Sequence, residues 1–73
     1  MKENIVGKIS YYDSTDKYGF FTVKELKEDV FFHIDDVFSE DDIEDVKEDN
    51  KFEFDIVKTE KGLRAKNIES LVI

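Results

Sequence analysis

The sequence predicts an all-β domain in which five short strands close into a small antiparallel barrel. Several runs of the 73-residue chain alternate apolar and polar side chains, which is the period of half-buried strands. Turn-forming residues separate these runs, and no stretch has a strong helical pattern, which favours a small closed or nearly closed barrel. Closure also removes most of the sheet edges that a small β-domain must otherwise protect. At this length we expect a single domain over residues 1–73.

The first strand is predicted over residues 5–12. Alternation places Ile5, Gly7 and Ile9 on one face and Val6, Lys8 and Ser10 on the other. Strict alternation then sends Tyr11 and Tyr12 to opposite faces, and a bulge would exchange them. The sequence therefore leaves open which of the two rings faces the core.

Strands two and three are predicted over residues 17–24 and 29–34, after turns at residues 13–16 and 25–28. Their core-facing side chains are Phe21 and Val23 in the second strand and Val30, Phe32 and Ile34 in the third. The opposite faces carry Tyr18, Phe20 and Thr22, and Phe31 and His33. Aromatic clusters left in water are commonly binding surfaces, so we expect one on these two strands.

A strongly acidic connection, residues 35–49, separates the third and fourth strands. It holds nine carboxylates and one lysine and so carries the whole formal net charge of −8, whereas the rest of the chain has ten acids and ten bases. The net charge therefore neither supports nor excludes a polyanionic partner. We expect Val37, Phe38, Ile43 and Val46 to anchor this connection, with a short helical turn at Val37 and Phe38 and a second turn permitted at Ile43 and Val46.

The fourth strand has the clearest alternation in the chain, with Phe52, Phe54 and Ile56 opposed to Lys51, Glu53 and Asp55. A loop over residues 58–62 ends at Gly62, which is suited to a positive φ. The fifth strand is predicted over residues 63–71. The phenylalanines assigned to the core, and so excluded from any binding site, are Phe21, Phe32, Phe52 and Phe54.

Composition narrows the class of protein. The chain has no cysteine, which fits a reducing intracellular setting, and it has neither a membrane-length apolar run nor a secretory signal. We therefore expect a soluble, cytoplasmic, unprocessed protein. His33 is the only histidine and has no cysteine partners, so a metal site is not expected. No nucleophile or substrate-polarising group accompanies it, so we expect no catalytic residue, no cofactor, no small-molecule substrate and no enzyme activity.

Two motifs resemble those of the cold-shock domain family, whose fold is a five-stranded barrel of the OB type. Tyr18-Gly19-Phe20-Phe21 resembles the core of the family's first RNA-binding motif, and Asp29-Val30-Phe31-Phe32-His33-Ile34 resembles its second. Residues 46–56 and 61–68 follow the family's fourth and fifth strands. The chain departs from the family where a motif lysine falls on Asp16, a glycine on Lys17, and a strand-one tryptophan on Tyr11.

The resemblance implies binding of single-stranded RNA and DNA by a monomer that keeps transcripts unstructured and affects transcription or translation. Unpaired bases stack on aromatic rings, each worth about 1–3 kcal/mol. The predicted nucleic-acid-binding residues are Tyr11, Lys17, Tyr18, Phe20, Asp29, Phe31, His33 and Lys61. The resemblance suggests that Lys17 and Lys61 contact phosphate and that Asp29 bonds to a base edge; Lys8, Lys58 and Arg64 are further candidates for phosphate contact.

Each of these residues also has a purely structural explanation. The rings can serve cross-strand packing, Asp29 can simply begin its strand, and the acidic connection can be an ordinary solvated loop. A competing hypothesis is an OB-type protein-interaction module, in which the acidic connection docks a basic partner and the rings form an interface patch.

Overall fold

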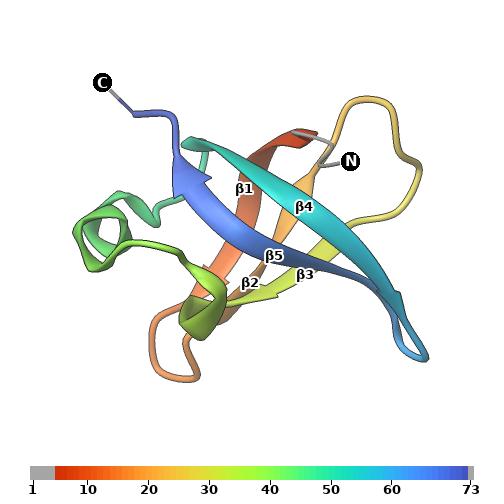
Figure 1. Ribbon diagram of the computed structural model, residues 1–73, viewed down its shortest axis with the longest axis horizontal. Helices are drawn as coiled ribbons and strands as arrows, with labels where there is room; N and C mark the ends of the chain where they lie inside the picture. The colour runs from red at the N-terminus through yellow and green to blue at the C-terminus, as the bar shows by residue number, and fades with distance from the viewer. Residues whose placement is uncertain (1–4, 73) are drawn as a thin grey trace.

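Five strands and two short 3-10 helices make up the fold. The computed structural model describes residues 5–72, and the order of elements along the chain is visible in Figure 1. The elements are β1 (Ile5–Asp13), β2 (Tyr18–Thr22), β3 (Val30–His33), η1 (Ile34–Asp36), η2 (Glu40–Asp45), β4 (Lys51–Thr59) and β5 (Gly62–Ser70). All five strands lie where the alternation predicts them, with ends that differ by up to three residues. The loop expected at residues 58–62 is confined to Glu60 and Lys61, because β4 and β5 continue their pairing as far as Thr59 and Gly62.

The strands form a closed barrel in the order β1-β2-β3-β5-β4, with β4 pairing back to β1. Four of the five pairings are antiparallel, whereas β3 and β5 pair in parallel through Phe31 and Arg64. In Figure 1, β4 and β5 cross in front of β1, β2 and β3, and the two 3-10 helices lie together at one end of the barrel. The all-β class and the five-stranded barrel are therefore confirmed, and a single parallel pair closes it.

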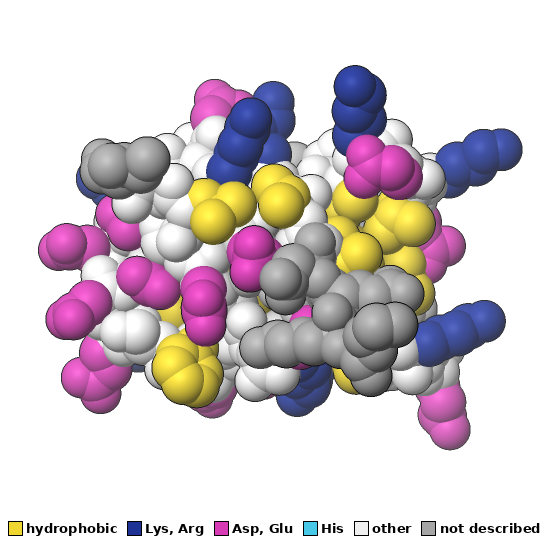
Figure 2. Space-filling model, turned by 45° about the horizontal axis from the view of Figure 1, so that its top comes forward, with side chains coloured by type: hydrophobic (Ala, Val, Ile, Leu, Met, Phe, Trp, Pro, Cys, Tyr) yellow, Lys and Arg dark blue, Asp and Glu magenta, His cyan; other side chains and the backbone are white. Residues whose placement is uncertain are grey.

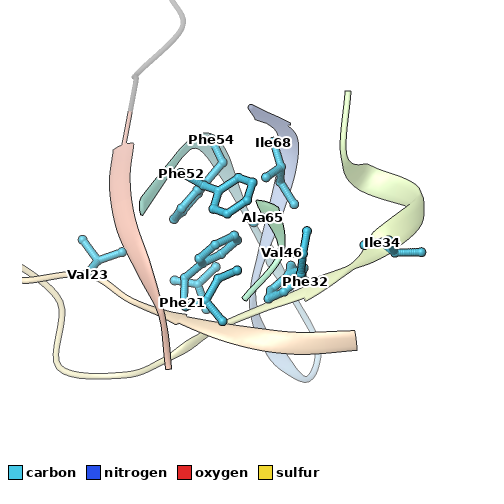
Figure 3. Close-up of a cluster of buried hydrophobic side chains, with 11 residues drawn as sticks. Phe21, Val23, Phe32, Ile34, Val46, Phe52, Phe54, Ala65 and Ile68 are labelled. Atoms are coloured by element: carbon cyan, nitrogen blue, oxygen red, sulfur yellow. The ribbon is translucent and has the colours of Figure 1, made fainter. Parts of the chain in front are cut away.

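The barrel interior is filled by the side chains that the alternation assigns to it. Phe21, Phe32 and Phe52 have no exposed surface, and Phe54 is 1% exposed. The Phe21 ring stacks on those of Phe32 and Phe54, with centroids 4.4 and 4.3 Å apart. Figure 3 shows these rings meeting at the centre, with Ala65 and Ile68 of β5 closing one side. Burying aromatic side chains of this size dominates the energetics of so small a core.

The acidic connection differs most from the expected local structure. The helical turn predicted at Val37 and Phe38 lies instead at Ile34–Asp36, where His33 caps it by accepting from the Asp35 N–H. Val37 is extended and bridges to Ile68 of β5, and the Phe38 side chain is 73% exposed, so it does not anchor the segment. Pairing with β5 sets this conformation. Val37 bridges to Ile68, and the Phe38 N–H donates to the Ile68 carbonyl.

The other two side chains expected to anchor the connection are Ile43 and Val46. The second helical turn is present as η2, but Ile43 within it is 41% exposed and only Val46 after it is buried. Val37 and Val46 therefore pack against the barrel core, while Asp36, Asp42 and Asp49 bond the acidic connection to β5 and β1. No helix among residues 5–72 has the length and apolar character needed to cross a membrane.

Candidate nucleic-acid interface

Four aromatic rings lie side by side on the outer surface of β1, β2 and β3. We call these rings, from Tyr11, Tyr18, Phe20 and Phe31, the aromatic platform. Tyr18 is 5.9 Å from Phe31, Phe20 is 5.9 Å from Phe31, and Tyr18 is 6.2 Å from Phe20, measured between ring centroids. Tyr11 joins them at 6.1 Å from Tyr18 and 6.4 Å from Phe20. The alternation of β2 and β3 therefore brings together the rings that the sequence assigns to the solvent side.

A bulge in β1 decides the position of Tyr11. The register of β1 against β2 shifts between Ile9 and Tyr11, so that Tyr11 pairs with Phe20 and Ser10 is the extra residue. The Ser10 hydroxyl donates to the Phe20 carbonyl at 3.2 Å. Both Ser10 and Tyr11 consequently point outward, with Tyr11 43% exposed, whereas Tyr12 turns inward and stacks on Phe32. The choice left open by the sequence is settled in favour of Tyr11.

Tyr11 of β1 presents a neutral ring. Interaction with the neighbouring Tyr18 phenol, together with partial burial and the Asp13 carboxylate, raises the pKa of Tyr11 above its ordinary value. Burial and Asp13 likewise raise the pKa of Tyr12. The Tyr11 hydroxyl therefore stays protonated at neutral pH and can donate a hydrogen bond without repelling an anionic ligand.

His33 extends the platform at the end of β3, where it pairs across strands with Tyr18. Its Nδ1 lies 3.1 Å from the Asp35 backbone nitrogen, whose N–H it accepts, and 3.5 Å from Asp35 Oδ2. The side chain is only half-buried. Part of the His33 ring is thus exposed beside Tyr18.

Lys17 immediately precedes the platform and has a left-handed backbone, with φ 61°. Its N–H donates to the Asp13 carbonyl at 2.7 Å and its carbonyl accepts from the Ile34 N–H at 2.9 Å, which fixes this conformation. Lysine is strained there because its Cβ approaches the carbonyl. This is the position at which the cold-shock motif has glycine, so the motif's spacing signals the unusual backbone although the residue type does not.

Two of the predicted site residues, Asp29 and Lys61, come from the loops at the ends of the strands. Asp29 precedes β3, is exposed and accepts the Thr22 hydroxyl at 3.4 Å. Lys61 lies in the turn between β4 and β5. It lines an open pocket of about 690 Å³ whose other walls are Phe20, Phe31, Thr59, Glu60, Leu63 and Arg64. The structure therefore brings Lys61 next to the platform rings.

An ion-pair cluster on β5 joins Arg64, a candidate for phosphate contact, to Asp36 and Lys66, which the sequence reasoning did not select. Asp36 of η1 accepts from Arg64 Nε at 3.0 Å and Nη2 at 2.9 Å, and from Lys66 Nζ at 3.1 Å. The Arg64 guanidinium also lies over the Phe31 ring, 5.6 Å from its centroid. The alternation of β5 marks Arg64 and Lys66 as sharing a face, but nothing in the sequence signals that Asp36 reaches them.

Charge is unevenly distributed over the molecule. Figure 2 shows acidic side chains crowded at one end of the displayed face and lysine or arginine side chains mainly along the top and the opposite end. Among residues 5–72, no group of three or more His, Asp or Glu side chains is arranged to hold a metal ion.

Comparison with known proteins gives consistent matches. The sequence model of the family described as 'Cold-shock' DNA-binding domain matches residues 5–71. The chain is similar to a "Cold shock-like protein" of Aquifex aeolicus (strain VF5), at 35% identity over 65 residues that cover 89% of this chain and 91% of the relative.

A solved structure has the same fold. The drosophila protein Unr CSD456 superposes with a TM-score of 0.80 at 22% sequence identity. The match covers 97% of this chain but only 28% of that longer chain. At this level of identity the similarity extends to the fold alone.

Proposed function

The chain belongs to the cold-shock domain family, and from this premise we propose that it binds single-stranded RNA, and single-stranded DNA, on its aromatic platform. The family is one of nucleic-acid-binding domains and is not typically enzymatic. The observation that carries the proposal is the outward cluster of Tyr11, Tyr18, Phe20 and Phe31, whose centroids lie no more than 6.4 Å from their nearest neighbours.

Stacking supplies the affinity in this proposal. Each unpaired base has a π-face, and stacking on an aromatic side chain contributes about 1–3 kcal/mol per base with little regard to sequence. A duplex offers few such faces because its bases are already stacked on one another. The platform therefore selects unpaired strands over paired ones.

Polar residues around the platform would orient the strand. Lys17, which precedes the platform, and Lys61, which lines a pocket with Phe20 and Phe31, would neutralise phosphates. Asp29 and His33 would bond to base edges. The acidic connection repels phosphate, so we expect the strand to run away from it.

The biological role would be passive. A protein that binds only the unpaired state shifts a hairpin equilibrium toward the open form by mass action, without hydrolysing a nucleotide. We therefore propose that the protein acts as a monomeric RNA chaperone in the cytoplasm, or as a regulator of transcription or translation that works through the same binding.

A titration with short oligo-U or oligo-dT at low salt tests the proposal, followed by amide and aromatic chemical shifts. We expect the largest shifts at Tyr18, Phe20, Phe31 and His33, and a much weaker response to a duplex of the same length. The proposal fails if saturating single strand leaves these four residues unperturbed.

One observation favours a second candidate function, a protein-interaction module. Phe38 and Ile43 are exposed by 73% and 41% within the acidic connection. Apolar side chains ringed by carboxylates suit a basic, amphipathic peptide. Titration with such a peptide would then shift residues 38–45 and leave the aromatic platform unchanged, which is the opposite of the pattern expected for a nucleic acid.

A further inference from the structure

The Arg64 guanidinium occupies a defined place at the edge of the aromatic platform. It lies over Phe31, and β3 and β5 pair in register at these two residues. It also forms part of the wall of the pocket that Phe20, Phe31 and Lys61 line. A base that enters this pocket therefore meets two aromatic rings and the guanidinium together.

Asp36 fixes the orientation of this guanidinium. Its Oδ2 accepts from both Nε and Nη2 of Arg64, and its Oδ1 accepts from Lys66. The Asp36 side chain is only 13% exposed, so water competes weakly for these bonds. A guanidinium has five N–H donors in one plane, and the hydrogen bonds described within residues 5–72 use only two of them. The remaining N–H donors of Arg64 are those on Nη1 and the outer one on Nη2. One donor from each of these two nitrogens points outward, and the two form a forked pair that can bind two adjacent acceptors.

The carboxylate also changes what this fork prefers to bind. A negative charge at 2.9 Å offsets part of the attraction that Arg64 exerts on a phosphate. The direction of the outward N–H donors of Arg64 is unchanged, because these donors point away from the Asp36 carboxylate. A fork fixed in one orientation suits a planar ligand that presents two adjacent acceptors, and the charge that Asp36 offsets reduces the advantage of a phosphate over a neutral ligand.

We propose that Arg64, positioned by Asp36, reads a guanine in the pocket beside Phe20 and Phe31, which makes one subsite of the platform base-selective. Guanine presents O6 and N7 as an adjacent acceptor pair, the edge that arginine most commonly contacts in a bidentate manner. Adenine has a donor in place of O6, and uracil has a donor next to each carbonyl. This inference rests on the proposed function, since it assigns a base preference to the same surface.

The experiment uses eight-nucleotide oligo-U in which a single guanosine is moved through every position, with affinity measured by tyrosine fluorescence. We expect one position at which guanosine raises the affinity by at least about fivefold, the lower end for a bidentate arginine contact. Inosine at that position should retain the gain because it keeps O6 and N7. 7-Deazaguanosine, which lacks N7, and adenosine should lose it. Retention of the gain by 7-deazaguanosine, or an equal gain from adenosine, would overturn the inference.

Two variants test which residues produce the preference for guanosine over uridine. Arg64→Lys keeps the charge but loses the planar fork, so the ratio of guanosine to uridine affinity should fall to about one. Asp36→Ala releases Arg64 and Lys66 to bind phosphate. It should lower the same ratio while it raises oligo-U affinity at low salt and steepens its salt dependence, which a merely structural defect would not do. Glu44→Ala, a matched charge removal in η2, should leave the ratio unchanged.

Other outcomes separate this inference from the proposed function. If the wild-type protein binds oligo-U and every guanosine-containing strand equally, only the guanine reading is wrong. If Arg64→Lys weakens uridine and guanosine strands by the same factor, Arg64 is a phosphate contact and the inference fails. If no single strand binds at all, the proposed function fails and the inference fails with it.

Discussion

The aromatic platform and the acidic connection are two surfaces of one barrel that are built in opposite ways. The platform lies on paired strands, so the backbone ladder and the packing of Phe21 and Phe32 beneath it fix where its rings point. The acidic connection, residues 35–49, has two short 3-10 helices and reaches the core mainly through Val37 and Val46. The platform thus depends on strand register, whereas the acidic connection carries the net charge and touches the platform side through Asp35, beside His33, and Asp36, beside Arg64.

This contrast explains how a protein with a net charge of −8 can offer a surface to a polyanion. The whole excess of negative charge lies in residues 35–49, and the remaining residues are balanced. Of these carboxylates, Asp36 is paired with Arg64 and Lys66, and salt screens the exposed ones at physiological ionic strength. We therefore expect stacking to contribute more than charge to affinity, and the predictions below test each side of this comparison.

The largest effect should come from the rings themselves. Replacing both Phe20 and Phe31 by alanine removes two stacking positions, worth together about 2–6 kcal/mol of binding free energy. Oligo-U binding should become undetectable in a fluorescence titration, while the far-ultraviolet circular dichroism spectrum is retained because both rings are only half-buried. Phe38→Ala, the same change in the acidic connection, is the matched control and should have little effect on binding. Unfolding of the double variant would show instead that the rings belong to the core.

The rigidity of the platform depends on Gly19, which lies between its rings in β2. A Cβ at this position would collide with the Tyr11 carbonyl oxygen and lie 2.8 Å from Cε1 of the buried Phe32. We expect Gly19→Ala to lower the free energy of unfolding by about 1–3 kcal/mol, as overpacking does. Chemical denaturation measures this. Gly62→Ala, whose Cβ has no atom within 4 Å, is the comparison that isolates backbone strain at φ 126° from collision. A Gly19→Ala protein as stable as the wild type would contradict the packing.

Lys17 should show opposite effects on stability and on binding. Lys17→Gly relieves a left-handed conformation that costs a side-chain-bearing residue about 1–2 kcal/mol, offset in part by the greater freedom of glycine when unfolded. The melting temperature should rise, whereas oligo-U affinity should fall and the salt dependence should lose about one phosphate contact.

Lys17→Ala is the control that separates the two effects. It removes the same charge but keeps the strained backbone, so it should lose affinity without gaining stability. Equal melting temperatures for the glycine and alanine variants would contradict the proposed strain.

The smallest effects should come from the acidic connection. Crowded like charges repel one another, and salt screens them, so the melting temperature should rise between low and moderate ionic strength. A Glu44→Gln, Asp41→Asn variant should be more stable than the wild type at low salt by a few tenths of a kcal/mol per charge and should show a weaker salt response. A wild-type melting temperature that is flat or falls over this range would contradict the prediction.

The sequence alone determined the part of the molecule that depends on local alternation. Side chains on a strand point to alternate faces whatever the fold, so Tyr18, Phe20 and Phe31 could be assigned to the outer surface and Phe21 and Phe32 to the core. The same rule, with the turn residues between the runs, predicted the five strands of the barrel. The positive φ of Gly62 was also predicted from its place in a loop.

Only the tertiary structure decided the features that depend on the register between distant segments. The bulge at Ser10, which turns Tyr11 outward, exists because the register between β1 and β2 shifts between Ile9 and Tyr11. Phe38 is exposed because pairing to β5 fixes the backbone beside it. Asp36 meets Arg64 across 28 residues of chain. No local pattern encodes these contacts, because each requires two segments to be placed against each other by the closed barrel before their side chains can meet.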